Sequence, residues 1–166
     1  MIIKSSYINK SGESIPQTYY DESDLEGVFS DSDFMGSHAF CFCDGKLVLV
    51  NHPTAGWTPP GGGREEGEIY TETAEREVKE ETNMKVVYQE LIGYNVFQLP
   101  DKTVKQTRSF CIVEPFGEFV ADPDGDIMEI KLIEPLEYKK YFDWGEVGDR
   151  IMQRAIELYK NYSNNK

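Results

Sequence analysis

The segment from Gly61 to Asn83 limits the possible folds of this chain more than any other. It opens with three consecutive glycines that follow Pro59 and Pro60, and such a stretch cannot be helical. From about Thr71 to Thr82 the residues instead follow a helical period. The sequence therefore predicts a loop of bare backbone that leads directly into a short helix.

Both ends of this helix carry residues that suit their positions. Thr71 suits an N-cap, and Glu72 in the first turn is favoured by the helix dipole. Asn83 follows the last turn, where many helices close with a residue at positive φ, usually Gly and sometimes Asn. We expect Asn83 to adopt this conformation at modest cost.

Three glutamates of the helix, Glu77, Glu80 and Glu81, span an arc of only ~100° on its surface. On one side of this arc lie residues that should pack on a sheet: Thr71, Ala74, Val78 and Thr82. On the other side lie residues that should face solvent: Glu72, Glu75 and Lys79. Like charges at i,i+4 destabilise a helix by roughly 0.2–0.5 kcal/mol per pair. The arc is thus either a solvated acidic face, partly balanced by Arg76 and Lys79, or a set of oxygen ligands for a hard cation such as Mg²⁺. The glycine loop favours the second interpretation, because bare backbone lets a metal or a phosphate chain approach.

Apolar runs on either side of this segment predict a mixed sheet. Residues 39–50 form two such runs around Asp44-Gly45, which suits a type I′ turn and predicts a β-hairpin. Further strands are expected at Val86–Tyr94, Lys105–Val113 and Met128–Ile133. A second helix is expected from Val147 to Tyr162, with an apolar stripe that should pack on the sheet: Val147, Ile151, Ala155, Leu158 and Tyr162. The order of elements predicts an α/β fold with helices packed on the sheet.

Size and composition favour one globular domain. The chain has 166 residues, of which 39% are hydrophobic, and no apolar run is long enough to cross a membrane. Its start lacks the features of a secretory signal, so we expect a cytoplasmic protein. The cysteines Cys41, Cys43 and Cys111 form no C-x-x-C pair, and Cys41 and Cys43 alternate in an apolar strand as small buried residues would.

The formal charge of −13 limits the class of partner. A surface this acidic repels a polyphosphate backbone, so we expect no nucleic acid polymer as a ligand. A small phosphorylated substrate, such as a nucleotide, is compatible with this charge if cations bridge the two sets of negative groups.

The stretch from Gly62 to Met84 resembles the Nudix box: glycine, five residues, glutamate, seven residues, then Arg-Glu-apolar-x-Glu-Glu-x-Gly-apolar. Gly62 opens it, Glu68 is the isolated glutamate, and "REVKEETNM" completes it. Asn83 in place of the last glycine is the one departure, at a position that needs a turn conformation and no functional group. The likeness extends from about Ala39 to Ile133, and residues 1–36 have no assigned role.

The resemblance implies a Nudix-type α/β/α sandwich with a mixed central sheet, formed by residues 1–166 as a single Nudix hydrolase domain. It implies hydrolysis of a nucleoside diphosphate linked to another group, as in a nucleoside triphosphate or an ADP-ribose-like substrate. The three glutamates of the arc would bind Mg²⁺ or Mn²⁺ and carry catalysis, with the Gly61 carbonyl as a further ligand. Glu68 and Arg76 would form a structural ion pair that ties the loop to the helix.

For several other candidate residues the sequence allows two interpretations. The carboxylate that takes the proton from water lies in the box or downstream, where the candidates are Asp124, Asp126 and Glu129, although "DPDGD" is also typical of a turn. Trp57 and Tyr94 either stack on a base or belong to the core. The cations Arg64, Lys105 and Arg108 either bind substrate or form surface ion pairs.

Two related functions are alternatives to hydrolysis. Nudix-like domains that act as non-catalytic nucleotide sensors usually show eroded metal ligands, whereas this box retains every charged position. Isoprenoid diphosphate isomerases need a cysteine at the site, and the sequence places Cys41 and Cys43 in a predicted strand. Hydrolysis is therefore favoured, with the sensor as the alternative.

Overall fold

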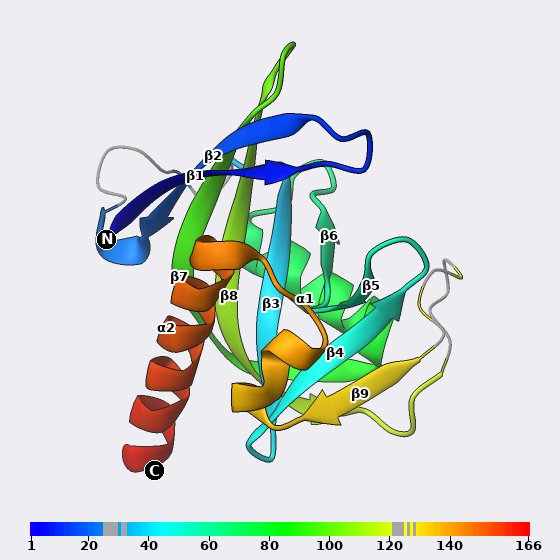
Figure 1. Ribbon diagram of the computed structural model, residues 1–166. Helices are drawn as coiled ribbons and strands as arrows, with labels where there is room; N and C mark the ends of the chain where they lie inside the picture. Colours follow the sequence, from blue (N-terminus) through cyan, green and yellow to red (C-terminus); the bar gives the residue numbers. More distant parts are fainter. Residues whose placement is uncertain (25–29, 31–32, 121–124, 126, 128) are drawn as a thin grey trace.

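The strands form one mixed sheet that carries a helix on each face (Figure 1). The computed structural model describes residues 1–24, 30, 33–120, 125, 127 and 129–166. Helix α1 (Tyr70–Thr82) contacts β3, β6 and β7 on one face, and α2 (Gly145–Asn164) packs on the opposite face. The predicted α/β/α sandwich is confirmed. No helix in the described part of the chain is long and apolar enough to cross a bilayer.

The sheet is built around the pairing of β3 with β8. The strands are β1 (Ile2–Ile8), β2 (Ser14–Asp21), β3 (Gly36–Cys43), β4 (Lys46–His52), β5 (Gly56–Thr58), β6 (Gly61–Gly63), β7 (Met84–Gln98), β8 (Thr103–Pro115) and β9 (Ile130–Ile133). They follow the order β1-β2-β7-β8-β3-β4-β5, with β6 paired to β3 and β9 to β4. The β3–β8 pair is parallel and the other described pairs are antiparallel, so the sheet is mixed as predicted. Two short 3₁₀ helices complete the fold: η1 (Glu22–Asp24) and η2 (Pro135–Lys140).

Strand β3 supplies side chains to both cores because successive side chains of a strand point to opposite faces. Ala39, Cys41 and Cys43 belong to the core under α1, whereas Phe40 and Phe42 belong to the core under α2. Both cysteines are buried free thiols, and burial raises the pKa of each. The interpretation of these cysteines as small buried residues is confirmed.

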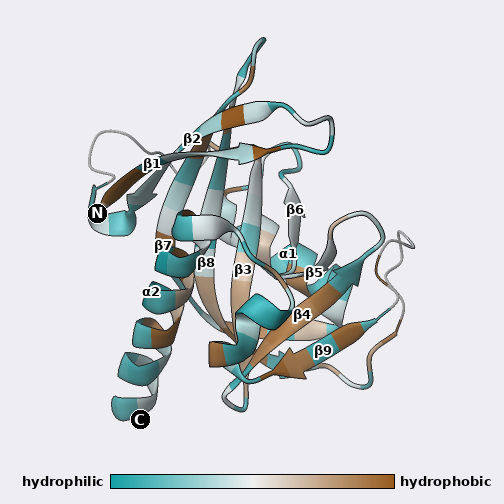
Figure 2. Cartoon of the chain, viewed as in Figure 1, coloured by the Kyte–Doolittle hydropathy of each residue, from teal (hydrophilic) through white to brown (hydrophobic). Residues whose placement is uncertain are grey.

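The second helix packs through the predicted stripe. Val147, Ile151 and Ala155 are buried, and Leu158 and Tyr162 pack against them in part. The outward side of α2 is hydrophilic, whereas β4 and β9 carry apolar residues (Figure 2). The helix is longer than expected at both ends.

Residues 2–21, part of the segment that had no assigned role, extend the sheet. Strands β1 and β2 form an antiparallel hairpin, and β2 pairs with β7 from Gln17↔Phe97 to Asp21↔Gly93. We therefore propose that the whole chain acts as one domain. The acidic segment 21–34 lies partly outside the described residues.

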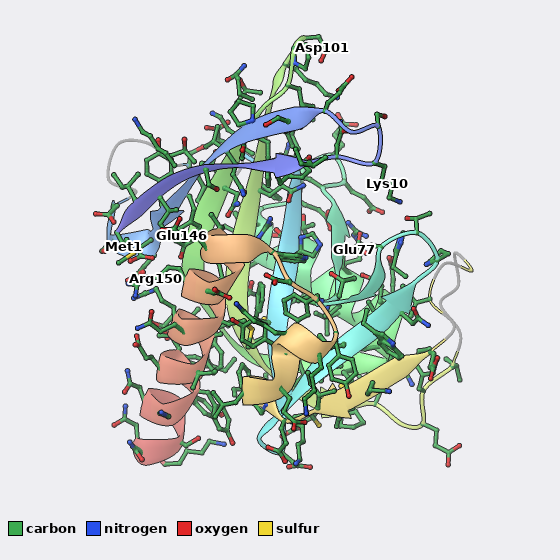
Figure 3. All side chains as sticks on the ribbon, viewed as in Figure 1. Met1, Lys10, Glu77, Asp101, Glu146 and Arg150 are labelled. Carbon is green, nitrogen blue, oxygen red and sulfur yellow. The ribbon has the colours of Figure 1, made fainter. Side chains whose placement is uncertain are left out.

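A buried carboxylate ties this hairpin to α2. Asp21 is 2% exposed and accepts hydrogen bonds from Arg150 Nη2 (2.6 Å) and Nε (3.2 Å) and from the terminal amine of Met1 (3.0 Å). Figure 3 shows Met1 and Arg150 on neighbouring elements. Burial raises the pKa of Asp21, but the hydrogen bonds from Arg150 and the amine outweigh it and lower the pKa to about 2. The pair therefore stays ionised at neutral pH.

Several predicted elements were too short, and the residue predicted as the N-cap of α1 was wrong. Asp44 (φ 49°) and Gly45 (φ 80°) form the predicted hairpin turn. Strands β7 and β8 run past their expected ends, because they continue as a hairpin beyond the rest of the sheet (Figure 1). Helix α1 begins at Tyr70 with Ile69 at the N-cap position, so Thr71 is not the cap. Glu68 bonds the hydroxyl of Thr73 at this end instead (2.9 Å).

Asn83 ends α1 in the conformation that the sequence predicted. Its backbone is left-handed (φ 55°, ψ 38°), and its N–H donates to the Lys79 carbonyl (3.0 Å). Its side chain also donates from Nδ2 to the Glu118 carbonyl (2.9 Å), a contact that sequence reasoning missed. Asparagine thus combines glycine's conformation with a link to the segment after β8.

We expect Asn83→Gly to change the free energy of unfolding by no more than about 1 kcal/mol, because relief at positive φ offsets one lost hydrogen bond. Asn83→Val should destabilise by about 1–3 kcal/mol, because a β-branched residue resists this conformation. Denaturant unfolding of both variants measures the difference. Equal stability of the two would show that φ at residue 83 does not matter.

Candidate active site

The glycine loop and the helix meet at Glu81. Strand β6 pairs with β3 so that Gly61 lies opposite His38. The Gly61 N–H donates to Glu81 Oε1 (2.7 Å), and Glu81 is only 5% exposed. A buried carboxylate is costly unless it is hydrogen-bonded or faces a cation. The Glu81 carboxylate is therefore stabilised by partners in the site and not by water.

At two positions of the glycine loop other groups occupy the space of a side chain, and at Gly61 one of these groups is backbone. A Cβ on Gly62 would overlap the carboxylate of Glu77, and a Cβ on Gly61 would overlap the Ser37 carbonyl. At Gly63 the nearest atom to such a Cβ, the Met35 carbonyl oxygen, is 3.9 Å away. The carboxylates of Glu77 and Glu81 therefore lie along two successive glycines.

One guanidinium joins the loop to the glutamate arc. Arg76 Nε donates to Glu68 Oε2 (2.8 Å), and its Nη1 donates to Glu77 Oε1 (3.0 Å) and Glu80 Oε2 (3.2 Å). Its Nη2 donates to the Gly63 carbonyl (2.8 Å) and to Glu68 Oε1 (3.0 Å). The carboxylates, Glu68 first, hold the pKa of Arg76 above its usual range. The ion pair predicted between Glu68 and Arg76 is present.

Glu68 fixes the loop that precedes α1. Besides Arg76, it accepts hydrogen bonds from the Glu65 N–H (2.7 Å) and from Thr73 Oγ1 (2.9 Å). These donors, Arg76 first, outweigh partial burial and lower the pKa of Glu68 to about 2. Arg64 donates from Nε to the Glu68 carbonyl (2.7 Å), and its guanidinium lies over the Phe34 ring. Arg64 therefore belongs to the loop scaffold.

The donor set fits a hard divalent cation. Glu68, Glu77 and Glu80 place three carboxylates around one guanidinium, and Glu81 lies against the glycine backbone. Oxygen ligands of this kind suit Mg²⁺. Among the described residues no three acidic, histidine or cysteine side chains are arranged as a ready metal site, and Glu77 and Glu80 point to Arg76 instead. Metal binding would therefore have to draw these two carboxylates away from Arg76.

A cavity of about 560 Å³ opens beside Gly61 and Glu81. Trp57 lies in its wall with Tyr141, and the two rings meet edge to face (6.4 Å). The Lys131 ammonium lies 5.0 Å from the Trp57 ring centroid. Trp57 thus both packs in the core and faces the candidate site.

A second cavity of about 610 Å³ adjoins the first, and His38, Asp143 and Trp144 line both. Arg108 lines this second cavity and is 4% exposed. Its Nη1 donates to the Thr107 carbonyl (3.0 Å) and its Nη2 to Gln106 Oε1 (3.0 Å). Arg108 is therefore not a surface ion pair.

The other sequence candidates that the structure describes, Arg64 among them, line neither cavity. Lys105 forms an ion pair with Asp33 (2.7 Å), which agrees with the interpretation of this residue as part of an ion pair. Tyr94 is fully buried and donates to the Asp33 carbonyl, so it belongs to the core. Glu129 is exposed, and its carbonyl accepts from the Asn51 N–H. Asp124 and Asp126 lie outside the described residues.

Sequence reasoning missed the polar residues of the second cavity. Gln17, Asn95 and His38 line it, and each lies on a strand whose sequence reads as ordinary alternation. Residue Trp144 was missed because it lies just before α2, where no motif marks it. A signal existed in Gln17, a polar residue that alternates with Ile15 and Tyr19 on the buried face of β2.

The chain was compared with known proteins. The family model described as NUDIX domain matches residues 36–155. The chain belongs to the Nudix family. YtkD of Bacillus subtilis (strain 168), which carries the provisional name 8-oxo-dGTP diphosphatase, is 30% identical over 148 residues, or 85% of this chain and 92% of YtkD. The family match and the similarity to YtkD together make this chain a Nudix hydrolase.

Solved structures show the same fold. The Bacillus subtilis pyrophosphohydrolase BsRppH has a TM-score of 0.70 and 24% identity, and the match covers 93% of this chain and 97% of that one. The NUDIX domain of Shewanella oneidensis NrtR, solved with ADP ribose, has a TM-score of 0.60 and 15% identity, over 84% and 99% of the two chains. At these identities the likeness concerns the fold alone.

The isomerase alternative finds no support in this Nudix hydrolase. Cys41 and Cys43 lie in the core under α1, and neither lines the two cavities described above. A catalytic cysteine would have to reach substrate. The burial of both thiols therefore argues against this reading.

Substituting Gly62 tests whether the close approach of loop and helix serves the reaction. Gly62→Ala should displace the Glu77 carboxylate and lower the hydrolytic rate at least tenfold, while the chain still folds, because a side-chain end moves more easily than backbone. Gly63→Ala is the matched control, since its Cβ meets only an ordinary contact. Rates and melting temperatures of both variants are compared with the parent. Equal rates for the two would mean that the position of Glu77 is unimportant.

Proposed function

We propose that this Nudix hydrolase is a divalent-metal-dependent enzyme that cleaves the pyrophosphate linkage of a nucleoside diphosphate linked to another group. One observation carries the proposal: the carboxylates of Glu77 and Glu81 lie along the glycine loop, beside a cavity of about 560 Å³. A solvated acidic face would not bury the Glu81 carboxylate.

We propose that Glu77, Glu80 and Glu81 would hold the metal, with the Gly61 carbonyl as a further ligand, and that the metal is Mg²⁺ or Mn²⁺. When bound, such an ion neutralises pyrophosphate oxygens and lowers the pKa of a coordinated water. Without metal, Arg76 holds Glu77 and Glu80 in place. By its bonds to Glu68 and the Gly63 carbonyl, Arg76 also holds the loop against α1.

The proton of the attacking water needs a carboxylate acceptor within hydrogen-bond reach. The glutamates of the arc are suitable, and Glu80, at 31% exposure of its side chain, is the most accessible of them to solvent. Trp57 and Arg64 are proposed substrate contacts, from the wall of the first cavity and from the loop. Arg108 is proposed to contact the substrate from the second cavity.

Metal removal is the first test. We expect EDTA to abolish hydrolysis and added Mg²⁺ or Mn²⁺ to restore it, because clustered carboxylates alone would repel a polyphosphate. Released phosphate or pyrophosphate is measured before and after chelation. Undiminished turnover in the chelated enzyme would refute the proposed metal dependence.

A substrate panel is the second test and separates the enzyme from a sensor. The panel contains nucleoside triphosphates, oxidised nucleotides, ADP-ribose, sugar nucleotides and dinucleoside polyphosphates, with Mg²⁺ present. We expect turnover of at least one member, and a fall of at least about 100-fold in Glu80→Gln and in Glu81→Gln, since each swap removes a charge but keeps the shape.

Glu75→Gln is the control for these variants, because Glu75 lies on the exposed side of the same helix. It should retain the parental rate, and all three variants should remain folded. Binding of one panel member without any turnover would identify a nucleotide sensor. Full activity in Glu80→Gln and Glu81→Gln would show that the arc is only an acidic surface.

A further inference from the structure

One side of the sheet ends in a strand with an unpaired edge. Strand β1 is the last strand of the sheet order, and within the described part of the chain it pairs only with β2 (Figure 1). Met1 and Lys10, labelled in Figure 3, lie just beyond its two ends. An exposed edge presents a row of backbone N–H and C=O groups that can pair with another strand. Strand β1 is therefore a candidate interaction surface.

The hydrogen bonds at the two ends of β1 show which of its residues point away from β2. The Asp21 N–H donates to the Met1 carbonyl (3.0 Å), and the Asn9 N–H donates to the Glu13 carbonyl (2.9 Å). Positions in an antiparallel pair alternate between hydrogen-bonded and non-hydrogen-bonded, so the odd-numbered residues of β1 bond to β2. The even-numbered residues direct their backbone groups outward, where no described residue bonds to them: Ile2, Lys4, Ser6 and Ile8.

The side chains of these four residues are also exposed. Ile2 and Ile8 have exposed fractions of 52% and 66%, and Tyr7, on the other face of the strand, is 41% exposed. Apolar side chains at both ends of an open edge are stabilised when a second surface removes them from water. The edge of β1 thus combines unpaired backbone groups with apolar side chains that face solvent.

The sequence of β1, IIKSSYI, has the same order of apolar and polar residues in both directions. When two copies of the strand pair antiparallel about Ser5, Ile2 of each copy lies opposite Ile8 of the other, and Ile3 lies opposite Tyr7. The polar residues at the centre then lie opposite one another. Every outward backbone group finds a partner in this register, and the apolar side chains meet apolar ones.

Neighbouring registers fit less well. A shift of two residues in one direction would place Lys4 opposite Lys4, and like charges directly opposite each other destabilise a sheet. A shift of two residues in the other direction would place Ile2 opposite Lys10, which lies outside the strand. A shift of one residue would set outward groups against groups that already bond to β2. The strand sequence therefore specifies one register.

Local charge favours this contact between two chains that repel each other overall. The formal charge of each chain is −13, but residues 1–12 contain no Asp or Glu and carry two lysines, Lys4 and Lys10. In the register about Ser5, Lys10 of one copy comes close to the Met1 end of the other, where the Asp24 side chain is 33% exposed. Opposite charges thus lie near each other at both ends of the contact.

We propose that the protein forms a two-fold symmetric dimer through β1, so that the sheets of two copies become one continuous sheet. A two-fold contact uses the same surface on both copies, and the self-complementary pattern of β1 meets this condition. Ser5, Ser6, Tyr7 and Ile8 also line the second cavity, so the contact borders the wall of that cavity. The inference is independent of the proposed function, because it concerns association and not hydrolysis.

Sedimentation equilibrium over a range of protein concentrations measures the association. We expect a reversible dimer of twice the 19.0 kDa chain mass, with a dissociation constant in the micromolar range or below. Ser6→Pro should raise this constant at least tenfold, because proline removes an outward N–H that each copy uses in the contact. The variant should keep the parental fold, since no described residue accepts a hydrogen bond from this N–H.

A charge swap tests the register. Ile8→Lys should raise the dissociation constant at least tenfold, because it sets an ammonium against Ile2 of the other copy. Leu136→Lys is the matched control: Leu136 is 83% exposed and lies on η2, so this variant should associate as the parent does. Adding Ile2→Glu to Ile8→Lys should restore association, since opposite charges then face each other across the contact. Positions 2 and 8 are about 20 Å apart along one strand, too far to meet within one chain.

A parent chain that stays monomeric up to about 100 μM would overturn the inference, because specific interfaces associate in the micromolar range or more tightly. A dimer that persists unchanged in both Ser6→Pro and Ile8→Lys would place the contact on another surface and overturn it as well. If the double variant stays monomeric while each single variant dissociates, the proposed two-fold pairing is refuted. Melting temperatures show which variants are folded, and Ile8→Lys, at an exposed side chain, decides the matter if Ser6→Pro unfolds.

Discussion

The site depends on a single guanidinium. Arg76 contacts Glu68, Glu77 and Glu80 and the Gly63 carbonyl, so it links the loop before α1 to two carboxylates on the helix. Without a cation these like charges would repel one another, and the loop would have no fixed place against α1. Glu81, the third carboxylate of the arc, is anchored separately by the Gly61 N–H. The spacing of the arc thus follows from one ion-pair network and one backbone hydrogen bond.

Much of this region was readable from the sequence. The Glu68–Arg76 pair was implied by the resemblance to the Nudix box. The positive φ of Asn83 and the burial of Ala74, Val78 and Thr82 followed from their positions in the helix. Thr71 was wrong as the N-cap, because a side chain one turn away, Glu68, organises that end. Propensity describes what a residue favours in isolation, and here a longer side chain decided the outcome.

The second cavity was not predictable, for a physical reason. Gln17, Asn95 and Arg108 lie on three strands that are far apart along the chain, and only the sheet order β2-β7-β8 brings them together. Alternation in a strand tells which face a residue occupies, but not which strand is its neighbour. The hairpin of β1 and β2 carried no motif, and its place beside β7 was visible only in the structure.

The Nudix match begins at residue 36, whereas β1 and β2 precede it and form part of the cavity wall. The lining of the second cavity therefore comes partly from outside the matched region, whereas the glutamates of the arc lie within it. An appended hairpin can change its sequence without disturbing the loop and helix that hold the carboxylates. A fold of this kind can change the residues that line the second cavity while the residues of the glutamate arc stay the same.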